Sequence, residues 1–293
     1  MNCGYVALIG RPNVGKSTLM NHLLKQKISI TSRKPQTTRH RILGINTTDA
    51  GQAIYMDTPG MHDNEKRALN RHLNRTADAT LMGVDVVVWL IDGPSWHEYD
   101  EVIFKKLEQA GLPVILAVNK VDKLLQKDIM LGFFATAQHR YPFEHLIPVS
   151  ALKGTNLDQL ENLIFGLLPE REFIYPEDQV TDRPERFLAA EIVREKLTRR
   201  LGAELPYELT VEIERYEELA GISKIYAIIW VERLTQKNIV IGREGEMLKK
   251  IGTDARLDIE KLIGQKVYLQ LWVKVKKGWS DNERALQSLG FHD

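Results

Sequence analysis

The chain has 293 residues, of which 43% are hydrophobic and 27% are charged, and its formal net charge at pH 7 is +1. That length is enough for two domains with a core each, and the composition excludes a disordered or fibrous protein. The single cysteine and the eight scattered histidines exclude an internal disulfide and a transition-metal site, and no apolar run reaches the roughly 18 residues that span a membrane, so we expect a cytoplasmic protein.

In the first half of the chain, short apolar runs alternate with longer amphipathic stretches. The runs Val6–Ile9, Val84–Ile91 and Val114–Val118 are almost free of polar residues, which is typical of strands buried on both faces of a mostly parallel sheet. Strands alternating with helices predict an α/β fold, here a doubly wound domain that we place at residues 1–175. Ligands of such a sheet bind beyond the carboxyl ends of its strands.

The first strand is followed by Gly-Arg-Pro-Asn-Val-Gly-Lys-Ser at Gly10–Ser17, a complete phosphate-binding loop sequence. Its glycines let backbone N–H groups converge on phosphate oxygens, and the next helix adds its N-terminal dipole. Lys16 is expected to reach the β- and γ-phosphates, and the Ser17 hydroxyl to coordinate Mg²⁺. The nucleotide contacts predicted in this segment are Gly10, Asn13, Val14, Gly15, Lys16, Ser17 and Thr18.

A second motif, Asp57-Thr-Pro-Gly60, follows the apolar run Ala53–Met56. Asp57 is placed to hold Mg²⁺ through water, and the Gly60 N–H to sense the γ-phosphate. Upstream, Thr37 or Thr38 completes the metal shell when triphosphate is bound. Both stretches would order with the γ-phosphate and relax on its loss, as in a two-state switch. The candidate catalytic residues are Lys16, Thr38, Asp57 and Gly60, and the candidate Mg²⁺ ligands are Ser17, Thr38 and Asp57.

The base is chosen by Asn119-Lys120-Val121-Asp122, directly after the strand Val114–Val118. The Asp122 carboxylate can accept from both N1–H and N2–H₂ of guanine, whereas adenine has no such donor pair and would leave the charge unpaired. Asn119 is expected at the O6 and N7 side, and Lys120 against the base and the phosphate loop. Ser150 and Ala151 follow a further apolar run, and a backbone N–H near Ala151 would face O6.

Residues 170–186 are polar, contain Pro176 and Pro184, and predict a linker before a second domain at residues 176–293. The patterns there predict six elements in the order αββααβ, which matches an α+β type II KH domain. The elements are a helix at Phe187–Leu201, strands at Leu209–Glu214 and Lys224–Arg233, a helix through Lys249–Ile251, a helix at Ala255–Ile263 and a strand at Val267–Val275. The tail Ser280–Phe291 is also expected to be helical.

Gly242-Arg-Glu-Gly245 would be the clamp of that domain, where two glycines let a sugar-phosphate chain approach the backbone. From Leu234 through Gly278 there are ten Lys or Arg against five Asp or Glu, so a basic surface is concentrated around the clamp. Glu244 inside the clamp argues the other way. The predicted RNA-binding residues are Ile239, Ile241, Gly242, Arg243, Gly245, Lys249, Lys250, Lys274 and Lys276.

The motifs GRPNVGKS, KPQTTRHR, DTPG, NKVD and SAL, in this order, resemble the Era group of translation-factor-related GTPases, and the resemblance covers nearly the whole chain. It implies a Mg²⁺-dependent switch that binds GTP and GDP, hydrolyses GTP slowly, recognises the 3′ end of small-subunit ribosomal RNA, and helps to mature the small ribosomal subunit. We expect a monomer, with peripheral contact to the inner face of the cell membrane left undecided.

One position departs from the pattern of many small GTPases, which carry Gln after the DxxG glycine to orient the attacking water. Here that residue is Met61, which cannot do so. In related GTPases the residue matching Asn13 helps to hold a potassium ion, so we take K⁺ at Asn13 as a hypothesis.

Three rival interpretations remain at this point. The chain could be a P-loop ATPase or kinase, which Asn119–Asp122 argues against. The second domain could bind protein or membrane instead of RNA. Finally, the chain could be a passive RNA-binding module that uses nucleotide as a structural cofactor.

Overall fold

The structure, a computed structural model, describes residues 1–32, 34, 37–59, 68–69, 71, 73, 76, 81–125, 128–202 and 205–289. The chain divides into two units. One consists of Met1–Ser29, Thr38–Met61 and Leu73–Asp182, and the other of Ile30–Thr37, His62–His72 and Arg183–Asp293.

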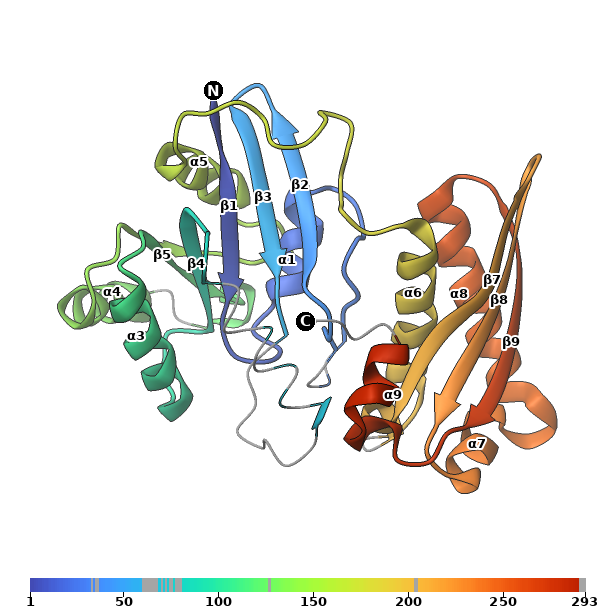
Figure 1. The fold of residues 1–293 in the computed structure, drawn as a ribbon. Coiled ribbons are helices and arrows are strands. Elements are labelled where there is room, and N and C mark those ends of the chain that lie inside the picture. Colours follow the sequence, from blue (N-terminus) through green and yellow to red (C-terminus); the bar gives the residue numbers. More distant parts are fainter. Residues whose placement is uncertain are drawn as a thin grey trace. The chain divides into compact units, whose positions relative to one another are not determined.

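A six-stranded sheet with the order β2-β3-β1-β4-β5-β6 is the centre of the first unit (Figure 1). All neighbouring strands are parallel except β2, which is antiparallel to β3. Every residue of β3 and β5 is buried, as expected for a parallel sheet covered on both faces. The doubly wound α/β prediction is confirmed. The strands are β1 (Asn2–Ile9), β2 (Ile42–Thr48), β3 (Gly51–Asp57), β4 (Val86–Asp92), β5 (Val114–Asn119) and β6 (His145–Pro148).

Helices lie in the connections that follow β1, β4 and β5 and supply the rest of the core, whereas a turn at Asp49 and Ala50 joins β2 to β3. An aromatic cluster under β4 joins the sheet to α3, where the Trp89 and Phe104 rings meet edge to face with centroids 4.6 Å apart. The helices of this unit whose bounds are given are α1 (Lys16–Leu23), α3 (Glu98–Ala110), α4 (Ile129–Arg140) and α5 (Leu157–Leu167).

The predicted linker has no helix or strand before Glu185, where α6 begins, and its first part runs along the sheet. The Cys3 N–H donates to the Pro169 carbonyl at 2.9 Å, and the Ile45 N–H to the Val180 carbonyl at 2.9 Å. These bonds explain why the first unit continues to Asp182.

The second unit has the element order αββααβ of the predicted KH domain. Its three-stranded sheet has the order β7-β8-β9, with β7 antiparallel and β9 parallel to β8. Helices α6 and α8 lie on one face of this sheet and enclose an apolar core with it (Figure 1). The elements are α6 (Glu185–Arg200), β7 (Leu209–Leu219), β8 (Ile222–Val231), α7 (Leu234–Ile241), α8 (Glu246–Ile263), β9 (Lys266–Val275) and α9 (Glu283–Ser288).

The predicted division of the helices around the glycines is wrong. One helix, α7, precedes Gly242, and the stretch that was expected to hold two helices is the single helix α8. Gly252 does not interrupt it, because a single glycine inside a helix costs only about 1 kcal/mol relative to alanine. Of the predicted helical tail, Glu283–Ser288 is helical, and residues 290–293 lie outside the described residues.

Among the residues that the structure describes, no helix is both long enough and apolar enough to cross a membrane.

Candidate nucleotide site and nucleic-acid interface

The phosphate-binding loop joins β1 to α1, and two of its glycines are required by close approach. Gly10 has φ +141°, and a Cβ there would lie 2.3 Å from the Leu90 carbonyl oxygen. Gly15 has φ +111°, and its Cβ would lie 2.3 Å from Nδ2 of Asn119. Both positions therefore exclude any side chain.

Lys16, the first residue of α1, is buried at the centre of this loop. Its Nζ donates to the carbonyls of Gly10 at 2.9 Å and Arg11 at 3.2 Å, which holds the amine inside the loop. Burial lowers the pKa of Lys16 to about 8, and the negative charge of Asp57 opposes that shift. The site thus holds an amine whose charge a phosphate would stabilise.

Three hydroxyl groups converge on the buried carboxylate of Asp57 at the end of β3. Its Oδ2 accepts from Ser17 at 2.6 Å, from Ser29 at 2.7 Å and from Thr38 at 3.5 Å. Its Oδ1 is buried and has no hydrogen-bond partner among the described residues. Burial raises the pKa of Asp57, and the Ser17 hydrogen bond, the Lys16 charge and the other two hydroxyls oppose that shift.

This donor set fits a magnesium ion. Mg²⁺ takes oxygen ligands, usually one or two carboxylates with waters and substrate phosphates. The Ser17 and Thr38 hydroxyls lie 3.0 Å apart beside the carboxylate, and the unpartnered Oδ1 of Asp57 is the orphaned polar atom that a cation with its waters would satisfy. Thr37 is turned elsewhere, since its Oγ1 donates to the Lys34 carbonyl at 2.6 Å.

The base pocket is formed by the ends of β5 and β6. The Ser150 hydroxyl donates to Oδ1 of Asp122 at 2.6 Å, which orients the carboxylate. Lys120 donates to the Asn13 carbonyl at 2.8 Å and forms an ion pair with Asp92 at 2.5 Å, so it fastens the pocket to the phosphate loop as expected.

Asn119 has two hydrogen-bond partners within the protein that the sequence did not indicate. We expected its amide at O6 and N7, and the Ala151 N–H facing O6. In the structure the Ala151 N–H donates to Oδ1 of Asn119 at 2.9 Å, while Nδ2 donates to the Val14 carbonyl at 2.7 Å. The amide nitrogen has a second N–H, so the contact with guanine stays a prediction. This one buried side chain therefore ties the phosphate loop to the loop after β6.

The sequence did not predict the role of Ser29, and two residues that it did single out lie outside the part of the chain that the structure describes. Ser29 is fully buried and donates to Asp57, but a serine in a polar stretch carries no signal that distinguishes it. Gly60 and Met61 lie outside the described residues. Thr18 lies in the first turn of α1, one residue beyond Ser17.

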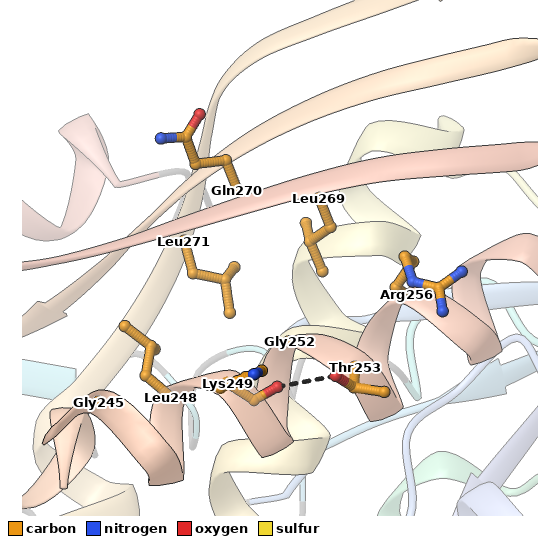
Figure 2. Close-up of a pocket in the computed structure, with 9 residues that line it drawn as sticks. All are labelled: Gly245, Leu248, Lys249, Gly252, Thr253, Arg256, Leu269, Gln270 and Leu271. Atoms are coloured by element: carbon orange, nitrogen blue, oxygen red, sulfur yellow. Dashed lines mark hydrogen bonds between the residues drawn. The ribbon is translucent and has the colours of Figure 1, made fainter. Parts of the chain in front are cut away.

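In the second unit, a groove of about 400 Å³ runs between α8 and β9. Figure 2 shows Leu269 and Leu271 of β9 pointing toward α8, whereas Gln270 points away on the other side of the strand. Leucines from β9 and polar groups from α8 thus give the groove an apolar wall and a polar one. It is lined by Gly245, Leu248, Lys249, Gly252, Thr253, Arg256, Leu269, Gln270 and Leu271.

Of the predicted RNA residues, Gly245 and Lys249 line this groove, and Gly242 and Arg243 lie in the turn that leads into it. A Cβ at Gly242 would lie 2.6 Å from that of Met247, so the turn requires this glycine too. The other lining residues were missed, although Leu269 and Leu271 alternate along a predicted strand.

The remaining predicted RNA residues lie outside the groove lining. Ile239 is 54% exposed on α7, and Ile241 packs against the core of the unit. Lys250 forms an ion pair with Glu246 at 2.6 Å. Lys274 and Lys276 lie near the Trp230 ring instead, with their Nζ atoms 5.9 and 5.7 Å from its centroid.

The fold and the two sites define a P-loop GTPase domain followed by a KH domain. Residues 5–120 match the family described as 50S ribosome-binding GTPase, and residues 204–280 match the KH domain family. Over 291 residues the chain is 56% identical to GTPase Era of Marinobacter nauticus, covering 99% of this chain and 95% of the relative. It is 55% identical to GTPase Era of Pseudomonas aeruginosa, with the same coverage.

Two solved structures match over the full length. One is an Aquifex aeolicus Era variant bound to GDP.AlF4-, with a TM-score of 0.97, 39% identity and 100% coverage of both chains. The other is Era in complex with MgGDPNP and nucleotides 1506–1542 of 16S ribosomal RNA, with a TM-score of 0.96, 39% identity and the same coverage. The chain belongs to the Era family of GTPases, enzymes that hydrolyse GTP.

Replacing Asn119 with alanine should weaken GDP and GTP binding equally, by about 10- to 100-fold. The change leaves the Val14 carbonyl and the Ala151 N–H unsatisfied and frees the two loops from each other. Titration with a fluorescent GDP would measure it. Asn2→Ala is the matched control, since it removes an amide-to-carbonyl bond of 2.7 Å to Phe165. Affinities within twofold of the parent would contradict the proposed tie.

Nucleotide affinity should also fall above pH 8. The pKa of Lys16 is about 8 in the free protein, and a bound phosphate raises it because the opposite charge favours the protonated amine. Binding then takes up a proton, so the Kd for GDP is flat below the free pKa and rises up to about tenfold per pH unit above it. Calorimetry across that range would measure the effect. GMP, which lacks the β-phosphate, controls for titration of guanine, and an equal pH dependence for both nucleotides would refute the assignment.

Proposed function

We propose that this chain is a GTP-hydrolysing switch that binds the 3′ end of small-subunit ribosomal RNA in its KH groove and assists assembly of the small subunit. The observation that carries the proposal is the presence, in one chain, of a nucleotide site and a groove next to the Gly242–Gly245 turn. The Era structure with MgGDPNP and a 16S ribosomal RNA fragment, to which this chain is similar over its whole length, supports the choice of RNA. We propose that the protein acts in the cytoplasm.

In the nucleotide site, Lys16 and the loop N–H groups bind the β- and γ-phosphates. Ser17, Thr38 and Asp57 would hold Mg²⁺, which neutralises charge that develops on the phosphate oxygens. Asp122, oriented by Ser150, accepts the two guanine donors and rejects adenine, because an unpaired buried carboxylate is costly. Asn119 ties the two loops together through its amide, and the second N–H of that amide would meet the O6 and N7 side of guanine.

The segment that carries the γ-phosphate signal also belongs to the second unit. Ile30–Thr37 is grouped with that unit, whereas Thr38, the next residue, is grouped with the first. The Thr31 N–H donates to Glu195 of α6 at 2.9 Å, and the buried Arg194 donates to the Thr37 carbonyl. A change at Thr38 on loss of the γ-phosphate therefore pulls on residues attached to α6, which supports a coupling in which GTP favours RNA binding and hydrolysis releases it.

RNA would enter along the groove beside Gly245, where the bases lie against Leu269 and Leu271 and the phosphates near Lys249. A groove of this kind holds about four single-stranded nucleotides. Arg256 lies on the same wall, where it forms an ion pair with Glu260 at 2.7 Å.

The proposal predicts that a short RNA copying the 3′ end of small-subunit ribosomal RNA stimulates GTP hydrolysis, and that Gly245→Asp abolishes the effect. A carboxylate beside the RNA phosphates should weaken binding at least about tenfold. GTP turnover with and without the RNA tests the site. RNA affinity, measured once with a GTP analogue bound and once with GDP bound, tests the direction of coupling.

Gly264→Asp is the matched control, because its φ of +72° resembles the +80° of Gly245 and a Cβ meets nothing within 4 Å at either position. It should bind RNA like the parent. Equal RNA affinity of all three proteins, or no RNA effect on turnover with normal basal hydrolysis, would reject the groove as the site.

Asn13 is also proposed to hold a potassium ion that takes over the charge-neutralising part that an arginine finger plays elsewhere. Its side chain is exposed at the tip of the phosphate loop, and its backbone has φ +65°. Hydrolysis should be about tenfold or more faster in K⁺ than in Na⁺. Asn13→Gly keeps the positive φ without the amide, so it should lose the difference. Identical parental turnover in the two salts would disprove the idea.

A further inference from the structure

The face of the second sheet opposite to α6 and α8 carries a row of aromatic rings. Along β9, Leu269 and Leu271 point into the groove and Gln270 points to the other side (Figure 2). Because side chains alternate along a strand, Tyr268 and Trp272 share the side of Gln270. We call this side the outer sheet face, and it comprises Tyr226 and Trp230 of β8 with Tyr268 and Trp272 of β9.

The rings on this face are arranged as a platform. Tyr226 and Trp272 are stacked, with centroids 6.0 Å apart and an interplanar angle of 16°, and Tyr268 meets Tyr226 edge-on at 6.0 Å. Tyr268 is 47% and Trp272 36% exposed. Large aromatic groups left in contact with water are characteristic of a binding surface.

Cations surround the platform, and acids are absent from its two strands. Lys274 and Lys276 lie near the Trp230 ring, and the strand register places Lys224 opposite Tyr268. Neither β8 nor β9 contains an aspartate or glutamate. The acids near this face lie on β7: Glu212 accepts from the Trp230 indole at 2.7 Å, Glu214 lies 3.5 Å from Lys274, and Glu217 lies opposite Lys224 and pairs with Arg215.

We propose that the outer sheet face is a second RNA surface, on which unpaired bases stack while the lysines contact phosphates. The proposal rests on the RNA-binding function above and extends it. Flat exposed rings require a flat partner and the lysines an anion, and a single-stranded RNA supplies both. Every nucleotide of an RNA carries both a planar base and a phosphate, whereas a protein partner would have to supply aromatic and acidic side chains from different residues.

The route of the RNA follows from the position of β9. It is the edge strand of the sheet, with the groove on one side and Tyr268 and Trp272 on the other. An RNA chain that leaves the groove can therefore pass over this edge onto the platform without crossing another β-strand. The clamp would read the first few nucleotides and the platform the next ones.

Binding of two RNAs of different length tests the proposal. Full-length protein is titrated with a labelled four-nucleotide RNA, which fills only the groove, and with an RNA of about 12 nucleotides. The parent should bind the longer RNA more tightly. Tyr268→Ala and Trp272→Ala should each lose about tenfold in affinity for it and bind the short RNA like the parent. Leu257→Ala, at a residue of α8 that is 44% exposed and outside the groove lining, is the control.

The outcomes separate the two proposals. No binding of the short RNA by the parent would reject the groove function itself. Short-RNA binding by all proteins, with unchanged long-RNA affinity in both aromatic variants, would overturn only the outer face. An equal loss for both RNAs in variants that unfold like the parent would also overturn it, since the rings would then make no contribution specific to the longer RNA. A parent that dimerises, with variants that do not and RNA affinities unchanged, would assign the face to contact between two copies.

Discussion

Asp57 places a carboxylate at the end of β3 where it is fully buried, and such a group is stable only if hydrogen bonds or a cation replace its lost hydration. Ser17 and Ser29 supply part of that replacement to one oxygen, and the other oxygen stays unpartnered among the described residues. In the free protein, part of the lost hydration of this carboxylate is therefore not replaced by the residues that the structure describes. A nucleotide with its metal ion would supply the missing partner for the carboxylate. The hydroxyls and the carboxylate, which come from separate segments, lie within hydrogen-bond distance of one another.

At the base pocket, the buried amide of Asn119 holds two loops together. It links Val14 to Ala151 across more than 100 residues of sequence, so the loops that contact phosphate and base cannot move independently. Its closeness to Gly15 also explains why that glycine admits no side chain. We assign the guanine specificity to Asn119 together with Asp122, whose carboxylate is oriented by a neighbouring hydroxyl.

In the second unit, one strand serves two surfaces because its side chains alternate. The leucines of β9 close the groove against α8, while Tyr268 and Trp272 face the opposite way. The break at Gly242 depends on close packing, since a Cβ there would lie 2.6 Å from that of Met247 in α8. The RNA surfaces of this unit thus follow from how closely one helix packs on one strand.

The sequence by itself determined the α/β class of the first domain, the αββααβ order of the second, and the motifs at Gly10–Ser17 and Asn119–Asp122, because these depend on hydrophobic period and on short-range chemistry. It also placed Gly245 and Lys249 near the groove. Only the tertiary structure decided that Asn119 bonds to protein at both ends, that Ser29 reaches Asp57, and that Lys274 lies on the outer face. These contacts join residues far apart in the chain, and their geometry is set by how the strands and helices pack, which no local pattern encodes.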